Sequence, residues 1–132
     1  MVKDMKLQFE LDCQKEVVSQ VIHKIINEIT AVDPEIQDIE FRVEMAAREM
    51  LANAIEHGCK TQEQFIQVEL KVSSSEVYLK VIDPGEGFDW ENADFSIPLL
   101  NERGRGLGMI KEAADRIKFN KVGNIITAYF CN

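Results

Sequence analysis

The spacing of apolar residues changes several times along this chain, and the order of those changes is what most restricts its fold. Alternation of apolar and charged or polar residues from Leu7 to Leu11 predicts a half-buried strand. Apolar residues at helical spacing then predict an amphipathic helix through Val18 to Ile29, followed by a second helix from about Ile39 to His57. Gly58 supplies the residue expected just beyond the C-terminus of that second helix.

The second half of the chain returns to strands and contains one more helix. We expect strands at Phe65–Val72 and Val77–Ile82, an irregular stretch at 83–103, a helix from near Gly106, and strands at Ile117–Lys121 and Ile125–Phe130. This order predicts an α+β fold, a two-layer α/β sandwich in which helices cover one face of a mostly antiparallel mixed sheet. The length of 132 residues suits one domain, 1–132, with a sizeable core.

Charge and cysteine content narrow the class of protein. The chain has 23 Asp and Glu against 15 Lys and Arg, a net charge of -8, which disfavours nucleic acid and anionic membrane surfaces as partners. No apolar run is long enough to span a bilayer. The three cysteines, Cys13, Cys59 and Cys131, are an odd number without CxxC spacing, so we expect reduced thiols in a cytoplasmic protein.

Six of the seven glycines fall in three short places, namely Gly58, then Gly85 and Gly87, then Gly104, Gly106 and Gly108. Glycine allows unusual backbone turns and close approach of other groups. The last cluster opens directly into the third predicted helix, where free backbone N–H groups and the helix dipole favour phosphate. The alternative is a flexible loop with a glycine-rich helix start.

Polar residues near the other glycines suggest binding or acid–base chemistry. Asp83 ends a predicted strand, where its carboxylate either accepts a hydrogen bond from a ligand or begins a turn. Glu49, Asn53 and His57 recur at intervals of four residues, so they share one helix face. An Asn oxygen can ligate Mg²⁺ and a Glu can act as a general base. The alternative is an ordinary solvated helix face.

These three segments together resemble a known family. Glu49–Gly58, Asp83–Phe88 and Glu102–Ile110 are similar to the N, G1 and G2 boxes of the GHKL ATP-binding fold, in the same order. The closer resemblance is to small bacterial anti-sigma regulatory factors that act as serine-protein kinases, through the run ERGRGLGMIKEAAD. It covers nearly the whole chain, and three boxes in register are more specific than any one alone.

The resemblance implies ATP and Mg²⁺ as cofactors and assigns roles to residues. Asn53 would hold Mg²⁺, Asp83 would accept a hydrogen bond from the adenine amino group, and Glu49 would be the catalytic base toward a serine hydroxyl. Gly85 and Gly87 would let the backbone pass close to the base, and residues 104–108 would wrap the phosphates. The residues expected to bind nucleotide are Asn53, His57, Asp83, Gly85, Gly87, Arg103, Gly104, Arg105, Gly106, Leu107 and Gly108. Thr127 is left out, because the family's Gly-Thr-Thr is replaced here by Gly123-Asn124-Ile125.

The function implied is that of a protein serine kinase and anti-sigma factor. Its partners would be an anti-sigma antagonist that carries the acceptor serine, a sigma factor, and a second copy of the chain in a homodimer. The segment at about 88–103 would be the ATP lid. Two alternatives stay open: a non-catalytic ATP-binding regulatory module, and the stand-alone ATPase half of a split histidine kinase.

Overall fold

The computed structural model describes residues 4–87 and 102–132, and within them the strands form one antiparallel sheet. The strand order is β1-β2-β3-β5-β4, and each of the four neighbouring pairs is antiparallel. The strands are β1 (Met5–Asp12), β2 (Phe65–Val72), β3 (Glu76–Ile82), β4 (Arg116–Phe119) and β5 (Ile125–Cys131).

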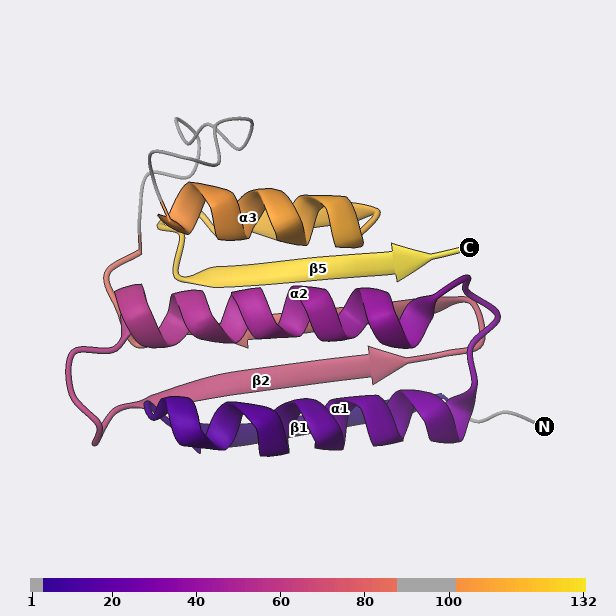
Figure 1. Ribbon diagram of the computed structural model, residues 1–132, viewed down its shortest axis with the longest axis horizontal. Helices are drawn as coiled ribbons and strands as arrows, with labels where there is room; N and C mark the ends of the chain where they lie inside the picture. Colours follow the sequence, from indigo (N-terminus) through magenta and orange to yellow (C-terminus); the bar gives the residue numbers. More distant parts are fainter. Residues whose placement is uncertain (1–3, 88–101) are drawn as a thin grey trace.

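Three α-helices cover one face of this sheet (Figure 1). They are α1 (Val18–Val32), which follows the short 3₁₀ turn η1 (Lys15–Val17), α2 (Ile39–Asn53), which continues into the π-helical turn η2 (Ala54–Gly58), and α3 (Glu102–Ala113). The predicted two-layer α+β sandwich and its order of elements are confirmed. In the described part of the chain, no helix has the length and apolar content that crossing a bilayer requires.

The core lies between the helices and the sheet, and it follows directly from the two apolar periods. In β2 every second residue from Ile66 to Val72 is buried, and the register pairs Leu7 with Leu70 and Leu11 with Ile66. The helical stripe of α1 supplies Ile25 and other buried side chains from the opposite layer. Each fully buried Leu or Ile contributes about 1.5–3 kcal/mol, so these two matched faces hold the layers together.

The third helix begins earlier than predicted. It starts at Glu102 rather than near Gly106, so residues 104–108 lie inside α3 instead of forming a loop before it. The buried side chain of Leu107, three residues before the fully buried Ile110, extends the apolar stripe of this helix toward its N-terminus. Residues 88–101, which make up most of the predicted lid, lie outside the described residues.

Arg42 on α2 joins the C-terminal end of α3 to the sheet. Its Nε donates to the Ala113 carbonyl oxygen at 2.9 Å and its Nη2 donates to Asp115 Oδ2 at 2.8 Å. The same Asp115 oxygen accepts the Cys131 backbone N–H at 2.8 Å. The hydrogen bond from the Cys131 backbone, together with the hydrogen bond and positive charge of Arg42, lowers the pKa of Asp115 below its ordinary value.

The cysteines differ from the prediction of three reduced thiols. Cys13 and Cys59 form a disulfide with a Cα–Cα distance of 6.0 Å, and Cys131 is the exposed free cysteine. The prediction failed because it considered only spacing along the chain. The two cysteines are 46 residues apart, but the end of β1 and the end of η2 meet at the same edge of the sandwich.

Candidate functional site

A small cavity lies where the C-terminal end of α2 meets β3, α3 and the turn between β4 and β5. Its lining residues are Met50, Asn53, Ala54, Val81, Asp83, Leu107, Phe119, Gly123, Asn124 and Ile126. The cavity therefore brings together one residue from each of the three predicted motif segments: Asn53, Asp83 and Leu107. Its volume is about 20 Å³, which is room for about one water molecule.

Asn53 carries an unmet hydrogen-bonding group at this cavity. Its amide nitrogen Nδ2 is buried and has no hydrogen-bond partner among the described residues. A buried polar group without a partner costs about 1–3 kcal/mol, so the site favours a ligand that supplies an acceptor oxygen. Asn53 thus fits an oxygen-rich ligand such as a phosphate, and its amide oxygen is of the donor type that Mg²⁺ prefers.

Asp83 begins a turn and also lines the cavity. Its Oδ1 accepts the Gly85 backbone N–H at 2.8 Å, which is the expected turn hydrogen bond. Its backbone N–H donates to the Asn124 carbonyl oxygen at 3.0 Å, and Asn124 Nδ2 donates back to the Asp83 carbonyl oxygen at 3.3 Å. These bonds hold Asp83 in the cavity wall, at the end of β3.

Gly58 and Gly85 make room for the Asp83 carboxyl group. A Cβ atom at Gly58 would lie only 2.4 Å from Asp83 Cγ, and one at Gly85 would lie 2.9 Å from Asp83 Oδ1. Real Cβ atoms do not approach other atoms so closely, so glycine is required at both positions. The sequence pointed to Gly58 only as a helix terminator, and its contact with Asp83 was missed.

Gly87 packs against protein backbone. Its φ of +86° favours glycine, and a Cβ there would lie 1.8 Å from the Val122 carbonyl oxygen. In this conformation Gly87 therefore lies in close contact with the turn between β4 and β5, and its expected place beside a nucleotide base stays a prediction.

The turn between β4 and β5 contributes two cavity-lining residues, Gly123 and Asn124, that sequence reasoning missed. Asn120 Oδ1 accepts the backbone N–H groups of Gly123 and Ile125 at 2.9 and 3.0 Å, and Asn120 Nδ2 donates to Asn124 Oδ1 at 2.6 Å. Two Asn residues around a glycine are typical of a turn stabilised by side chains. That signal could have identified the turn, although not its contact with Asp83.

The other predicted residues lie in several places. Glu49 is half-buried on α2, one helical turn before Asn53, and His57 is exposed in η2; neither lines the cavity. Gly108 is half-buried in α3 and does not line the cavity either. For Arg103, Gly104, Arg105 and Gly106 only the helical backbone is described. Thr127 pairs with Lys80 and Lys118 and lines a groove on the sheet face away from the helices.

Two ionisable side chains with shifted pKa values lie on that open sheet face. Burial and a hydrogen bond to Glu69 raise the pKa of Tyr78 to about 12. Hydrogen bonds from Tyr78 and Gln8 lower the pKa of Glu69. Within the described ranges, no group of three or more His, Cys, Asp or Glu is placed so that it could hold a metal ion.

The sheet covered by helices on one face and the cavity between Asn53 and Asp83 define a GHKL-type ATPase fold. The chain belongs to the histidine kinase-like ATPase domain family, whose model matches residues 10–130. No curated protein matches the chain.

One similar solved structure is the crystal structure of the RsbU and RsbW domains of Rv1364c from Mycobacterium tuberculosis. Its TM-score is 0.66 at 19% sequence identity, and the match covers 96% of this chain and 31% of that one. This chain therefore spans about a third of the length of that protein chain. At such low identity the likeness supports the fold.

Proposed function

We propose that this protein is an ATP- and Mg²⁺-dependent serine-protein kinase that also acts as an anti-sigma factor. The observation that carries the proposal is the cavity in which the buried, unpartnered Asn53 amide lies in the same wall region as Asp83, within a histidine kinase-like ATPase fold. An unmet buried donor beside a carboxylate favours a ligand that has both acceptor oxygens and a donor group. ATP has both, in its phosphates and its adenine amino group.

In this proposal Asp83 and Asn53 bind the nucleotide and Glu49 acts in phosphoryl transfer. Asp83 would accept the adenine amino hydrogen, and Asn53 would contact the phosphates and hold Mg²⁺. The metal, when bound, neutralises charge on the phosphates. Glu49 lies one helical turn before Asn53, a spacing that keeps both side chains on one side of α2. It would take the proton of the acceptor serine as the serine oxygen bonds to the γ-phosphorus and ADP leaves.

Nucleotide entry requires a change from the conformation described here. A cavity of about 20 Å³ holds about one water and is far too small for adenine. In addition, residues 106–108 lie within helix α3, where backbone N–H groups beyond the first four are used inside the helix. We infer that the part of the cavity wall formed by α3 moves when ATP binds, which would free residues 104–108 and Arg103 to wrap the phosphates.

The partners are part of the same proposal. The acceptor would be a serine on a small anti-sigma antagonist, and the unphosphorylated antagonist would displace a bound sigma factor. The similar solved structure carries two domains, named RsbU and RsbW, which supports a role in which this fold works with other regulatory proteins. We propose a homodimer as the active form and the cytoplasm as its location.

A transfer assay tests this function. The protein is incubated with γ-labelled ATP, Mg²⁺ and candidate antagonists from its own genome, and the Glu49→Gln variant serves as the matched control. Label on a partner that is stable to acid, labile to alkali and absent with the variant supports the proposal. Acid-labile phosphohistidine would indicate the ATPase half of a split histidine kinase. ATP binding without transfer to any candidate would indicate a non-catalytic regulatory module.

A further inference from the structure

The disulfide between Cys13 and Cys59 joins two elements at the edge of the candidate site. Cys13 follows the last residue of β1, and Cys59 follows the last residue of η2, the turn that ends at Gly58. Their Cα–Cα distance of 6.0 Å is ordinary for a disulfide, so the fold brings these residues to bonding distance without rearrangement.

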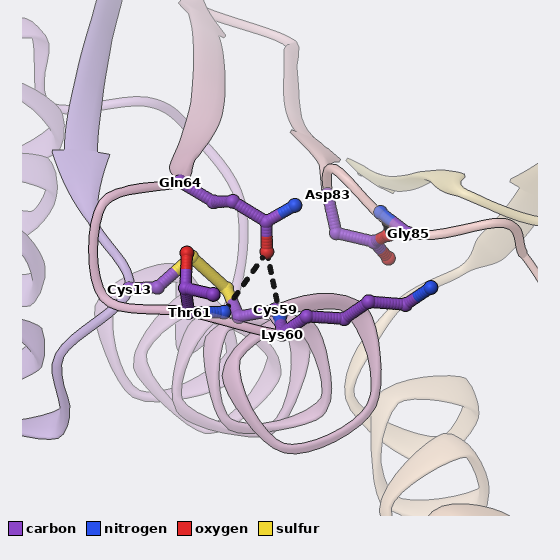
Figure 2. Close-up of a disulfide and its surroundings, with 7 residues drawn as sticks. All are labelled: Cys13, Cys59, Lys60, Thr61, Gln64, Asp83 and Gly85. Carbon is purple, nitrogen blue, oxygen red and sulfur yellow. Dashed lines mark hydrogen bonds between the residues drawn. A yellow bond between two sulfur atoms is a disulfide. The ribbon is translucent and has the colours of Figure 1, made fainter.

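The same loop supports both cysteines. Gln64 accepts the Cys13 backbone N–H at its carbonyl oxygen, at 3.3 Å. Gln64 Oε1 accepts the backbone N–H groups of Lys60 and Thr61 at 2.6 and 3.2 Å, which turns the chain back directly after Cys59 (Figure 2). The disulfide therefore anchors the segment from η2 to β2 on the end of β1.

This anchor is one residue away from the contact that positions Asp83. Gly58 packs so closely on Asp83 that a Cβ atom at Gly58 would come within 2.6 Å of three atoms of the Asp83 side chain. Gly85 packs against both Asp83 and Gly58. Figure 2 shows Asp83 and Gly85 in the surroundings of the disulfide, on the other side of the Gln64 side chain. A shift of the chain at Cys59 therefore moves the surface against which the Asp83 side chain rests.

We propose that Cys13 and Cys59 form a reversible oxidation site that sets the affinity for ATP through the contact between Gly58 and Asp83. The oxidised form holds Gly58 against Asp83 and binds ATP more tightly, and the reduced form binds it more weakly. The inference rests on the proposed function, because it takes Asp83 as the residue that binds adenine.

The reduced form is expected to bind ATP more weakly because of the contacts that hold η2 once the disulfide is broken. Without the covalent bond, hydrogen bonds alone hold the end of η2. The bond from the Cys59 N–H to the Ala54 carbonyl oxygen, at 2.9 Å, lies within the turn, and Gln64 still connects Lys60 and Thr61 to Cys13. Each of these hydrogen bonds opens more readily than the covalent S–S bond. The segment at Gly58 then samples more positions, and ATP binding must restore the one that positions Asp83, which reduces the apparent affinity.

The exposure of Cys13 and Cys59 indicates which sulfur atom is attacked when the disulfide is reduced and when it forms. Cys13 is 6% exposed and Cys59 is half-buried, so the thiolate of a dithiol reductant attacks Cys59 Sγ and releases the Cys13 thiolate. The second thiol of the reductant then displaces Cys59, leaving a cyclic disulfide and two protein thiols. For oxidation by hydrogen peroxide, the Cys59 thiolate becomes a sulfenic acid with loss of hydroxide, and the Cys13 thiolate displaces the second oxygen as water after protonation.

In a reducing compartment, formation of this disulfide would report a rise in oxidant. Disulfides in the cytosol are usually transient and either catalytic or redox-sensing. With the cytoplasmic location proposed above, Cys13 and Cys59 would be reduced under ordinary conditions and joined when peroxide rises. The kinase would then hold ATP at lower concentrations than in its reduced form.

Calorimetric titration with a non-hydrolysable ATP analogue and Mg²⁺ tests the inference. We expect the Kd of the peroxide-oxidised protein to be about tenfold lower than that of the dithiothreitol-reduced protein, a typical coupling between two sites. Cys59→Ser should bind weakly in both conditions. The matched control is Cys131→Ser, which removes the free exposed cysteine and should keep the full redox response.

The results separate the two proposals. Equal Kd values for the oxidised and reduced protein, or tighter binding by the reduced one, would overturn the redox site and leave ATP binding intact. No binding by either form would refute the proposed function and this inference with it.

Reciprocity gives a second measurement that needs no variant. If oxidation tightens ATP binding about tenfold, a saturating ATP analogue must shift the thiol–disulfide equilibrium about tenfold toward the disulfide. Thiol labelling in a dithiothreitol buffer measures that shift. An equilibrium that the analogue leaves unchanged, although it binds, would contradict the inference, even if Cys59→Ser fails to fold.

Discussion

Replacing Gly58 with alanine tests whether this glycine exists to accommodate Asp83. The backbone at Gly58 does not have the positive φ found at Gly87 and Gly123, so alanine fits its conformation. In a helical turn, alanine is favoured over glycine by about 1 kcal/mol. Against this gain, the new Cβ would lie 2.4, 2.5 and 2.6 Å from Asp83 Cγ, Cβ and Oδ1.

We expect the steric clash with Asp83 to outweigh the gain in helix propensity. Asp83 Cβ is attached to the backbone at the end of β3 and cannot rotate away, so the strand end or η2 must shift. Overpacking of this kind costs about 1–3 kcal/mol, and a cost in the upper part of that range leaves a net loss of up to about 2 kcal/mol after the helical gain. For a chain of this size, that loss lowers Tm by up to about 8 °C.

Thermal unfolding followed by circular dichroism measures the loss, and titration with an ATP analogue measures the effect on the site. We expect at least a tenfold weaker Kd, because the displaced carboxyl group is the one proposed to bind adenine. The matched background is Asp83→Gly, which removes every side-chain atom in the clash. There Gly58→Ala should be neutral or stabilising. An unchanged Tm in the wild-type background, or an equal loss in both backgrounds, would refute the reasoning.

Three further predictions concern single side chains. Asp83→Asn should abolish or severely weaken ATP binding in a calorimetric titration, because an amide nitrogen would face the adenine amino group; near-native affinity would remove Asp83 from the site. Glu49→Gln should leave ATP binding intact and reduce phosphoryl transfer by about 10²-fold or more in the labelled-ATP assay, and an unchanged rate would make this residue structural. Because the Cys131 N–H and Arg42 lower the pKa of Asp115 in the folded protein, its contribution to stability is present at neutral pH and is lost as the pH falls through that lowered value. Asp115→Asn should therefore lower the urea midpoint at pH 7, with a difference from wild type that shrinks toward pH 2; a difference that does not change with pH would contradict this explanation.

The layers of the fold could be predicted because they depend on local periodicity. The alternation at Leu7–Leu11 and the helical stripe through Val18–Ile29 each identify the buried face of one element, and the register and burial agree with both. The predicted start of α3, near Gly106, was wrong by about four residues. Leu107 belongs to its apolar stripe, but the surrounding glycines looked like a loop.

The candidate site could be predicted only as separate pieces. Asn53 and Asp83 were recognisable from their motifs, and the structure brings both to one cavity. The contact between Gly58 and Asp83, the turn held by Asn124, and the pairing of Cys13 with Cys59 join distant segments, and no local pattern reports such contacts. His57 lies exposed in the π-helical turn η2, and its expected contact with the nucleotide stays a prediction.

The position of the disulfide also affects the unfolded chain. The closed loop spans 46 residues and contains all of α1, which packs on β1 and β2, and all of α2, which packs on β3 and β5. Closing a loop of that length removes conformational freedom from the unfolded ensemble, equivalent to about 4 kcal/mol in the chain-entropy model. That is a large fraction of the roughly 5–15 kcal/mol that stabilises a typical domain. Oxidation would therefore reduce the fraction of molecules open to proteases, so the abundance of this protein in a cell would follow its redox state.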